Sequence, residues 1–286
     1  MQTKINKDSL SARVTNLAKS KKVPANVIYA RYFFDSFLMR ITNSNYKDKF
    51  ILKGGLLLSS ILGIEFRSTL DIDFSLKKIN MQKETISNIF KEICLLPGND
   101  NIDFKYIGIS QIRKEDIYGG YSAKILGRLE NIKQLFEIDV ATGDSITPNE
   151  IIYPYKCLLT GEEIKISAYN METVVAEKVQ TLLQRRNFNS RAKDFYDLYV
   201  IDKTCFDSLN LNVLKEAFKA TCHRRSFEIS YAEARQILSE ISVSNIIIAN
   251  WRIFSQNKAY AKGISLSDVL SAVAHILENI YGMTCD

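Results

Sequence analysis

The chain has 286 residues, of which 46% are hydrophobic and 24% are charged, and its formal net charge is +6. This is the composition of an ordinary globular protein, and it excludes low-complexity and collagen-like chains. The length favours two domains, or one domain with a large elaboration. No stretch reaches the roughly 18 unbroken apolar residues of a membrane span, and the first residues lack the apolar segment of a signal peptide. We therefore expect a cytoplasmic protein with no membrane partner.

The positive charge is concentrated at the start of the chain. Residues 1–53 contain eleven Lys or Arg residues and three acids. Such a basic end indicates a polyanionic partner or substrate, or else a solvated helical face rich in lysine. The five cysteines are odd in number and never form a C-x-x-C pair, which favours reduced thiols over a disulfide framework or a zinc site.

The hydrophobic pattern predicts helices mixed with strands up to about residue 168, and helices only beyond it. The first part contains expected helices at 10–19, 25–42, 56–63 and 81–96, and expected strands at 50–53, 70–76, 104–114, 121–130, 135–142 and 163–169. Residues 131–134 would connect two of these strands as a hairpin. In the second part, Ser230-x-x-Glu233 and Ser265-x-x-Asp268 are capping-box starts of helices. This order predicts an α+β domain followed by a helical one.

Two aspartates interrupt the strand expected at residues 70–76. Alternate residues of a strand point to the same face, so Asp71 and Asp73 would project side by side, roughly 7 Å apart. The residues expected to face a core are Leu70, Ile72 and Phe74. Two ionised carboxylates this close repel each other, and a divalent cation such as Mg²⁺ resolves the repulsion. The alternative is an exposed edge strand with solvated acids.

A glycine pair lies upstream of the aspartates. The strand expected at 50–53 runs directly into Gly54-Gly55 and a short helix. Glycines let the backbone approach a phosphate, and the free N–H groups at a helix start attract anions. A phosphate-binding turn followed by a metal-binding carboxylate pair is what nucleotidyl transfer requires. A glycine pair alone is more often a plain turn, so the prediction depends on both motifs.

A third carboxylate commonly completes a two-metal site. The strand expected at 135–142 alternates, which leaves Glu137 and Asp139 on the face opposite its apolar residues. We predict Asp139 as the third ligand, with Glu137 and Asp144 as alternatives. Asp144 also suits the turn that follows the strand.

Lys178 occupies an unusual place in the helix that follows Asn170. It lies within or beside the apolar stripe, four residues after Val174 and four before Leu182. A buried ammonium group needs a partner. Either Lys178 reaches into the active cleft and binds a triphosphate, or its stem covers apolar surface while its charge stays in water.

A basic segment leads into the next helix. Arg191 and Lys193 are candidates for pairing with phosphate, and Asp194 is a candidate for holding Lys178 or a nucleotide. The alternative for Asp194 and Asp197 is favourable placement near the positive end of the helix. P-loop, dinucleotide-binding, nucleophile-elbow and H-E-x-x-H motifs do not occur, so other chemistries have little support.

Together these motifs resemble the AbiEii/AbiGii-type nucleotidyltransferase toxins of type IV toxin–antitoxin and abortive-infection systems. The resemblance covers roughly residues 10–200 and depends on K-G-G…R-x-T-x-D-x-D combined with A-E-K…R-x-K-D-x-x-D. It implies a nucleotidyltransferase-fold mixed sheet with flanking helices, followed by an all-helical C-terminal domain. The implied domains are an N-terminal helical extension at 1–48, a catalytic domain at 49–168, and a helical domain at 169–286 that contributes Lys178 and Asp194 to the cleft.

The resemblance also implies functional residues by position. The catalytic set is Asp71, Asp73, Asp139, Lys178 and Asp194, of which the first three bind metal. The nucleotide-binding set is Lys53, Gly54, Gly55, Arg67, Thr69, Lys178, Arg191 and Lys193. Of the metal ligands, Asp139 matches the least uniform position. The implied cofactor is Mg²⁺, with Mn²⁺ as an alternative, the substrate is an NTP, and a cognate antitoxin is encoded nearby.

The predicted reaction is attack by a hydroxyl, favoured as an RNA 3′-OH at the end of a tRNA, on the α-phosphate of the NTP. Pyrophosphate is the leaving group. One alternative keeps the fold and changes the acceptor to protein, as in AMPylation. Another is a non-catalytic module that binds nucleotide or RNA, although such a module has no need of the D-x-D pair.

Overall fold

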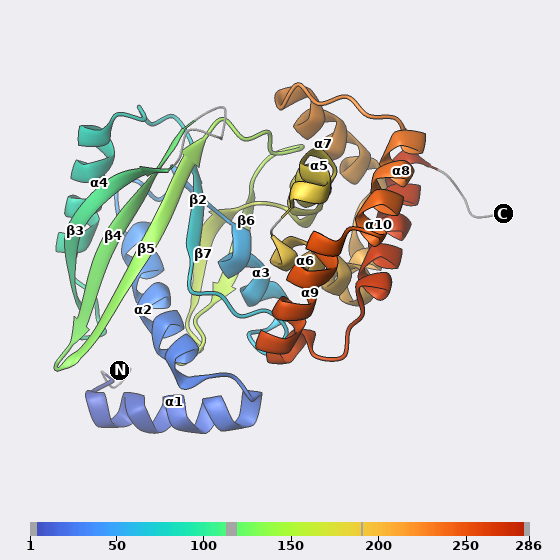
Figure 1. Ribbon diagram of the computed structural model, residues 1–286. Helices are drawn as coiled ribbons and strands as arrows, with labels where there is room; N and C mark the ends of the chain where they lie inside the picture. Colours follow the sequence, from blue (N-terminus) through green and yellow to red (C-terminus); the bar gives the residue numbers. More distant parts are fainter. Residues whose placement is uncertain (1–4, 113–118, 190, 283–286) are drawn as a thin grey trace. The chain divides into compact units, whose positions relative to one another are not determined.

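The computed structural model describes residues 5–112, 119–189 and 191–282, and the chain divides into two compact units (Figure 1). The first unit comprises Met1–Asp144 and Glu150–Tyr169, and the second comprises Ser145–Asn149 and Asn170–Asp286. The first unit is a mixed sheet with helices, and the second consists of helices. The fold is therefore mixed α+β, as predicted, with a helical C-terminal region.

The elements of the first unit are α1 (Lys7–Lys21), α2 (Ala25–Thr42), β1 (Phe50–Lys53), α3 (Gly54–Leu62), β2 (Ile72–Leu76), α4 (Lys83–Leu95), β3 (Asp103–Ile112), β4 (Gly120–Leu129), β5 (Ile132–Thr142), β6 (Ile151–Lys156) and β7 (Glu163–Ala168). The second unit contains α5 (Met171–Arg185), α6 (Ala192–Thr204), α7 (Leu211–Arg224), α8 (Tyr231–Ser242), α9 (Asn245–Asn257) and α10 (Leu266–Tyr281). Its short 3-10 helices are η1 (Arg186–Phe188), η2 (Phe206–Ser208) and η3 (Ala259–Ala261).

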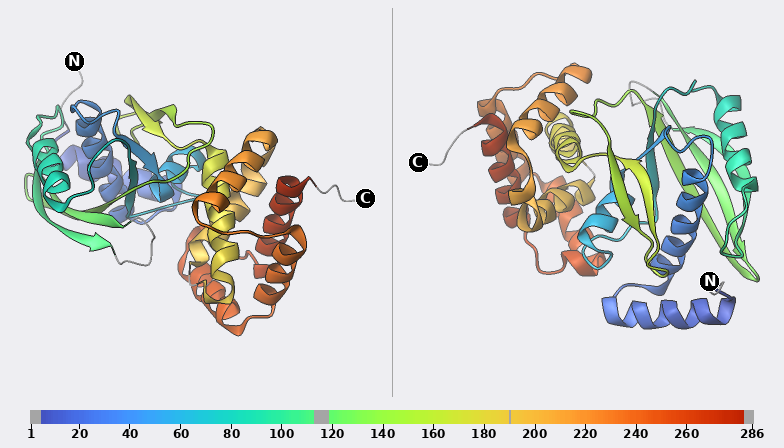
Figure 2. Two further views of the ribbon diagram at one scale, coloured as in Figure 1. Left: turned by 90° about the horizontal axis from the view of Figure 1, so that it is seen from above. Right: turned by 180° about the vertical axis from the view of Figure 1, so that it is seen from behind.

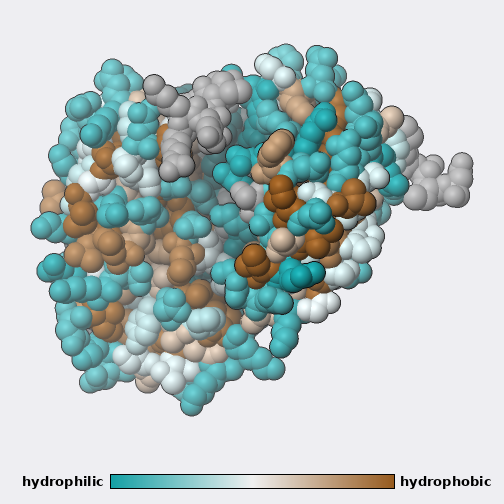
Figure 3. Space-filling view, viewed as in Figure 1, coloured by the Kyte–Doolittle hydropathy of each residue, from teal (hydrophilic) through white to brown (hydrophobic). Residues whose placement is uncertain are grey.

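The described strands form one sheet in the order β3-β4-β5-β2-β1-β7-β6. β2 runs parallel to β5 and β1 runs parallel to β7, while the other neighbouring pairs are antiparallel. Figure 2 shows α2 and α4 on one side of the strands β3–β5. The core on that side is an aromatic cluster formed by Phe34, Phe37, Phe50, Phe74, Phe90, Phe104 and Phe136. The opposite side of these strands carries both hydrophilic and hydrophobic side chains (Figure 3).

Helix α1 spans the end of the sheet. The backbone N–H of Lys7 donates to Glu130 Oε1 in the turn between β4 and β5, at 3.1 Å. Six residues later, Arg13 Nη1 donates to the carbonyl of Leu159 between β6 and β7, at 3.4 Å. α1 therefore connects two turns that are distant from each other in the sheet order.

A buried carboxylate ties α2 to the far edge of the sheet. Asp35 accepts hydrogen bonds from Arg31 Nε at 2.8 Å, the Tyr155 hydroxyl at 2.5 Å and the Leu158 N–H at 2.6 Å. Burial raises the pKa of Asp35 despite these donors. One side chain thereby satisfies donors from α2, β6 and the turn after β6.

Several sequence predictions are confirmed and several are wrong. Both capping boxes are present, at Ser230 and Ser265. The strand expected at 70–76 begins at Ile72, and Leu70 is 49% exposed rather than buried in a core. The connection between β4 and β5 is the two residues 130–131, so residues 132–134 belong to β5. The last two residues of the strand expected at 104–114 lie outside the described residues.

Strand β6 was not predicted from the sequence. It contains Pro154, which cannot donate to a strand ladder and argues against an ordinary strand. The structure resolves the contradiction because β6 lies at the edge of the sheet and pairs only with β7 among the described strands. An edge strand tolerates proline.

An internal ion cluster joins α5 to α6 in the second unit. Lys178 Nζ donates to Asp194 Oδ1 and to Asp197 Oδ2, both at 2.7 Å, and its side chain is only 13% exposed. Burial alone would lower the pKa of Lys178, but the two carboxylates raise it well above its ordinary value. Burial likewise opposes ionisation of Asp194, and the charge of Lys178 holds the pKa of that carboxyl below its usual range. Lys178 and Asp194 therefore remain charged at neutral pH.

In the described ranges, none of the helices combines the length and the apolar character that a bilayer crossing requires.

The ion cluster makes a stability prediction. In Lys178→Met the carboxylates of Asp194 and Asp197 lose their buried counter-ion, and we expect the free energy of unfolding to fall by about 3–5 kcal/mol. Urea unfolding of the full chain, followed by circular dichroism, measures this loss. The matched control is Lys203→Met, because Lys203 is 56% exposed in its pair with Asp202 and should contribute less than about 1 kcal/mol.

The pH dependence of this loss follows from the signs of the two shifts. The lowered pKa of Asp194 stabilises the fold at pH values above the pKa that this carboxyl has in the unfolded chain. The raised pKa of Lys178 stabilises the fold at pH values below the pKa that this lysine has in the unfolded chain. The difference between wild type and Lys178→Met should therefore be full between about pH 5 and pH 10 and shrink below about pH 4. A difference that stays constant down to pH 3 would contradict the assignment.

Candidate active site

Four side chains form one row across adjacent strands of the first unit. The register pairs Lys53 on β1 with Asp73 on β2, Asp73 with Asp139 on β5, and Asp139 with Ser122 on β4. Because side chains alternate along a strand, this row projects from the side opposite the aromatic core. The structure thus brings Asp73 and Asp139 together, although 65 residues separate them in the sequence.

The electrostatics of Asp139 reflect this row. Burial raises the pKa of Asp139, the nearby hydroxyl of Ser122 opposes that rise, and the negative charges of Asp73 and Asp71 add to it. The net result is a pKa above the ordinary value. A cation placed among these carboxylates would relieve their repulsion.

Gly54 stands directly against Asp73. Its φ angle is +67°, which favours glycine, and a Cβ at this position would overlap the carboxylate of Asp73. Gly54 is also the first residue of α3. The backbone at the start of α3 and the Asp73 carboxylate are therefore in direct contact.

The segment before β2 folds back onto the start of α3. A Cβ at Gly55 would lie 2.9 Å from Thr69 Oγ1 and 3.2 Å from Arg67 Nη2. Thr69 Oγ1 accepts a hydrogen bond from the Asp71 N–H at 3.1 Å, and Arg67 is only 5% exposed. Asp71 itself precedes β2 and is exposed, so it adjoins the strand rather than belonging to it. Arg67, Thr69 and Asp71 are thereby held beside the glycine pair.

The two alternatives to Asp139 are engaged elsewhere. Asp144 Oδ2 accepts from Lys53 Nζ at 2.5 Å and from the Tyr169 hydroxyl at 2.6 Å. Burial opposes ionisation of Asp144, but the ammonium of Lys53 lowers its pKa below the usual range. Glu137 is 58% exposed and pairs with Lys124 at 3.1 Å. Of the three candidates, only Asp139 pairs in register with Asp73.

The remaining predicted residues belong to the second unit and form a cluster of their own. Lys178 is bound by Asp194 and Asp197, as described above, and the positive charges of Arg191 and Lys193 help to keep the pKa of Asp194 low. Asp197 was not predicted as a partner of Lys178, although its position three residues after Asp194 places both on one face of α6. Ser122 was also missed, because nothing in the sequence reveals the strand register.

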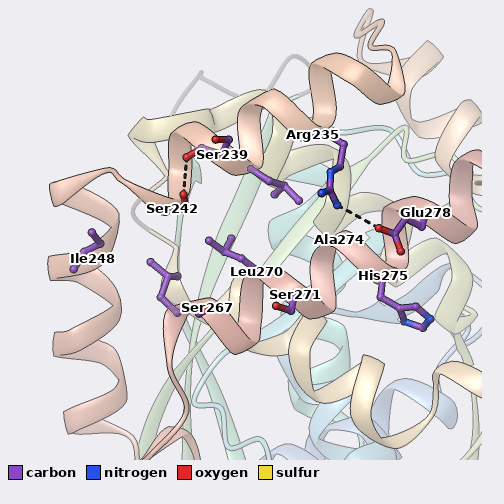
Figure 4. A pocket seen from close by; sticks show the side chains of 12 residues that line it. Arg235, Ser239, Ser242, Ile248, Ser267, Leu270, Ser271, Ala274, His275 and Glu278 are labelled. Carbon is purple, nitrogen blue, oxygen red and sulfur yellow. Dashed lines mark hydrogen bonds and ion pairs between the residues drawn. The ribbon is translucent and has the colours of Figure 1, made fainter. Parts of the chain in front are cut away.

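A separate cavity of about 650 Å³ lies between α8, α9 and α10 (Figure 4). Its lining is mostly apolar and serine side chains, and Arg235 Nη1 donates to Glu278 Oε1 at 3.2 Å on its wall. Glu278 is the one carboxylate in this lining. The cavity thus lacks the carboxylate pair that the aspartate row provides.

The donor set of the row fits a magnesium ion. Within the described residues, no three His, Cys, Asp or Glu side chains converge into a closed metal site. Mg²⁺ does not require one, because it usually binds through one or two carboxylates together with substrate phosphates. Asp73 and Asp139, next to an anion-attracting helix start at Gly54, supply that combination.

Comparison with known proteins finds similar structures and one matching family. Two crystal structures from Helicobacter pylori have similar folds. The first, a candidate nucleotidyltransferase, is 14% identical with a TM-score of 0.51, and the alignment covers 91% of this chain and 96% of that one. The second, JHP933, is 16% identical with a TM-score of 0.50, covering 88% and 92%. At these identities the likeness shows the fold alone. No curated protein sequence matches the chain.

The sequence itself matches one family, described as "Nucleotidyl transferase AbiEii toxin, Type IV TA system", over residues 36–267. This match covers most of both units and confirms the family predicted from the motifs. The chain belongs to the AbiEii nucleotidyl transferase toxins of type IV toxin–antitoxin systems.

Proposed function

We propose that this nucleotidyltransferase toxin uses Mg²⁺ and an NTP to modify RNA, with the 3′ end of tRNA as the acceptor. The observation that carries the proposal is the in-register pairing of Asp73 with Asp139 beside Gly54. The basic first 53 residues support a polyanionic acceptor. Membership of a type IV toxin family implies a cognate antitoxin.

Each part of the first unit has a role in this proposal. Asp73 and Asp139, with Asp71 beside them, would hold Mg²⁺ or Mn²⁺, which supplies Lewis-acid stabilisation of charge on the phosphates. The backbone N–H groups at Gly54 and Gly55 bind the outer phosphates. Arg67 and Thr69 pack against Gly55 and keep this turn in place.

The reaction joins the oxygen of the acceptor hydroxyl to the α-phosphorus of the NTP. The bond from that phosphorus to the bridging oxygen of the β-phosphate breaks, pyrophosphate leaves with the electron pair, and the hydroxyl proton passes to solvent. The fixed orientation of Asp73 and Asp139 on neighbouring strands supports an in-line geometry, because neither side chain depends on a flexible loop.

For the second unit we propose a phosphate-binding role. The bonds of Asp194 and Asp197 to Lys178 favour a positioning function, in which both aspartates fix the ammonium group. Arg191 and Lys193, exposed at the start of α6, supply further positive charge for binding phosphate. Lys53 is held by Asp144, which supports a role in shaping the site from the β1 side.

A labelling experiment tests the proposal and its alternatives. The purified protein is incubated with Mg²⁺, each labelled NTP in turn, and either tRNA or total cell protein. Labelled tRNA that disappears with EDTA supports the proposal. Labelled protein supports nucleotidylation of a protein acceptor, and tight NTP binding without any label supports a binding module.

Asp73→Asn tests the metal-binding role at nearly constant shape. The neutral amide removes a ligand and the charge that balances the cation, and we expect kcat to fall by about 10³-fold or more, since a bound metal contributes several kcal/mol. Single-turnover labelling of tRNA measures the loss, and the thermal unfolding temperature shows that the fold is kept. Activity within tenfold of wild type would rule out Asp73 as a metal ligand.

The third carboxylate is identified by a pair of matched variants. Asp139→Asn should reduce kcat as severely as Asp73→Asn, because both carboxylates occupy the same row. Glu137→Gln, two residues away on the same strand face, should keep nearly full activity because its side chain is largely exposed. The reverse ranking of the two variants would transfer the role to Glu137.

A further inference from the structure

The strand face that carries the aspartate row continues well beyond it. Moving along β4 and β5 away from Ser122 and Asp139, the register pairs Lys124 with Glu137, then Leu126 with Leu135, then Arg128 with Lys133. Each step of two residues advances about 7 Å, so this surface extends about 20 Å from Asp139. Lys105 joins it from β3, opposite Leu126. We call this surface the hairpin face; its residues are Lys105, Lys124, Leu126, Arg128, Lys133 and Leu135.

The hairpin face is accessible and predominantly basic. Lys105, Arg128 and Lys133 are exposed, and Leu135 is 51% exposed. Figure 3 shows apolar side chains among hydrophilic ones over β3–β5. Beyond the aspartate row, the acids on the same side of β3–β5 are Asp103 and Glu137, so four cations lie among two carboxylates, and Lys124 pairs with Glu137. Basic side chains, the exposed Leu135 and the half-buried Leu126 therefore lie together on one strand face.

The basic N-terminal helix begins where the hairpin face ends. Glu130, in the turn after Arg128, accepts the hydrogen bond from the Lys7 N–H at the start of α1. Along α1 and just past it, Arg13, Lys19 and Lys22 are exposed. Positive charge therefore continues from the strand ends onto α1, within the first unit.

A single-stranded nucleic acid matches this pattern. Its phosphates are neutralised by lysine and arginine side chains, and its unpaired bases can lie against apolar side chains between them. The charge of this surface, with four cations against two carboxylates, favours a polyanionic acceptor over a protein. The face also leads directly to Asp139.

We infer that the hairpin face binds the single-stranded end of the acceptor RNA and directs its terminal hydroxyl toward Asp139. This inference rests on the proposed function, in which RNA is the acceptor. Arg128 and Lys133 contact phosphates upstream of the reacting end, and Leu126 and Leu135 support the bases between.

The test neutralises the far end of the face, away from the aspartate row. The double variant Arg128→Gln/Lys133→Gln is compared with Lys83→Gln/Lys91→Gln, which removes the same charge from α4 on the helix-covered side of the sheet. Fluorescence anisotropy with a short labelled single-stranded RNA and with unfractionated tRNA gives the affinity at several salt concentrations. The slope of log K against log salt is negative, and we expect it to become less negative by about 1.4 for the short strand in the first variant. In the second variant the slope should stay unchanged.

Kinetics provide the second readout. The first variant should raise the KM for tRNA while the KM for NTP and kcat at saturating tRNA stay at the wild-type value. Circular dichroism melting checks that both variants are folded.

The outcomes separate this inference from the proposed function. Wild-type labelling of tRNA with unchanged RNA binding in the first variant would overturn the hairpin face and leave the proposed function standing. Absence of tRNA labelling by wild type, with RNA binding weakened only in the first variant, would support the face and overturn the reaction. A first variant that loses protein labelling while RNA binding is unchanged would assign the face to a protein acceptor and contradict the inference.

Discussion

The parallel pairing of β2 with β5 is the constraint on which the candidate site depends. It places Asp73 opposite Asp139 on strands that neighbour each other at about 4.8 Å, where two carboxylates repel by roughly 3 kcal/mol at an effective dielectric constant of 20. The opposite faces of the same strands bury residues that contribute roughly 1.5–3 kcal/mol each: Ile72, Phe74, Ile138 and Val140. The core therefore outweighs the repulsion and holds the two acids together before any cation arrives.

Two clusters of buried charge, one in each unit, have opposite effects on the pKa values of their members. In the second unit, Lys178 is balanced by Asp194 and Asp197, and the pKa shifts of Lys178 and Asp194 both favour the charged forms. In the first unit, burial raises the pKa of Asp139 instead, and the negative charges of Asp73 and Asp71 add to that rise. A balanced cluster stabilises the helices that carry it, whereas neighbouring carboxylates such as Asp73 and Asp139 repel each other and favour the binding of a cation. This contrast supports the proposed division between positioning by the Lys178 cluster and metal binding by the aspartate row, although both consist of the same residue types.

Local patterns in the sequence were sufficient for most of the helices and strands and for singling out Asp73 and Asp139, which the structure brings together. The D-x-D motif, the glycine pair and the capping boxes at Ser230 and Ser265 each depend on residues a few positions apart, so sequence reasoning could find them. Contacts between distant segments could not be found in this way. The hydrogen bonds of Asp144 with Lys53, the position of Ser122 beside Asp139, and the edge strand β6 all depend on register and sheet order. Leu70 was misplaced because the strand begins two residues later than its alternation suggested.

The contact between Gly54 and Asp73 has a consequence for how this site can change over time. Since a single added methyl group at Gly54 would occupy the space of the Asp73 carboxylate, the two residues must fit together sterically. A larger residue at Gly54 cannot be compensated by a later substitution at Asp73, because the first substitution already disrupts the site. Substitutions that adapt the enzyme to new nucleotides or acceptors are therefore expected at other positions of the site. Gly54 and Asp73 should be either both kept or both lost.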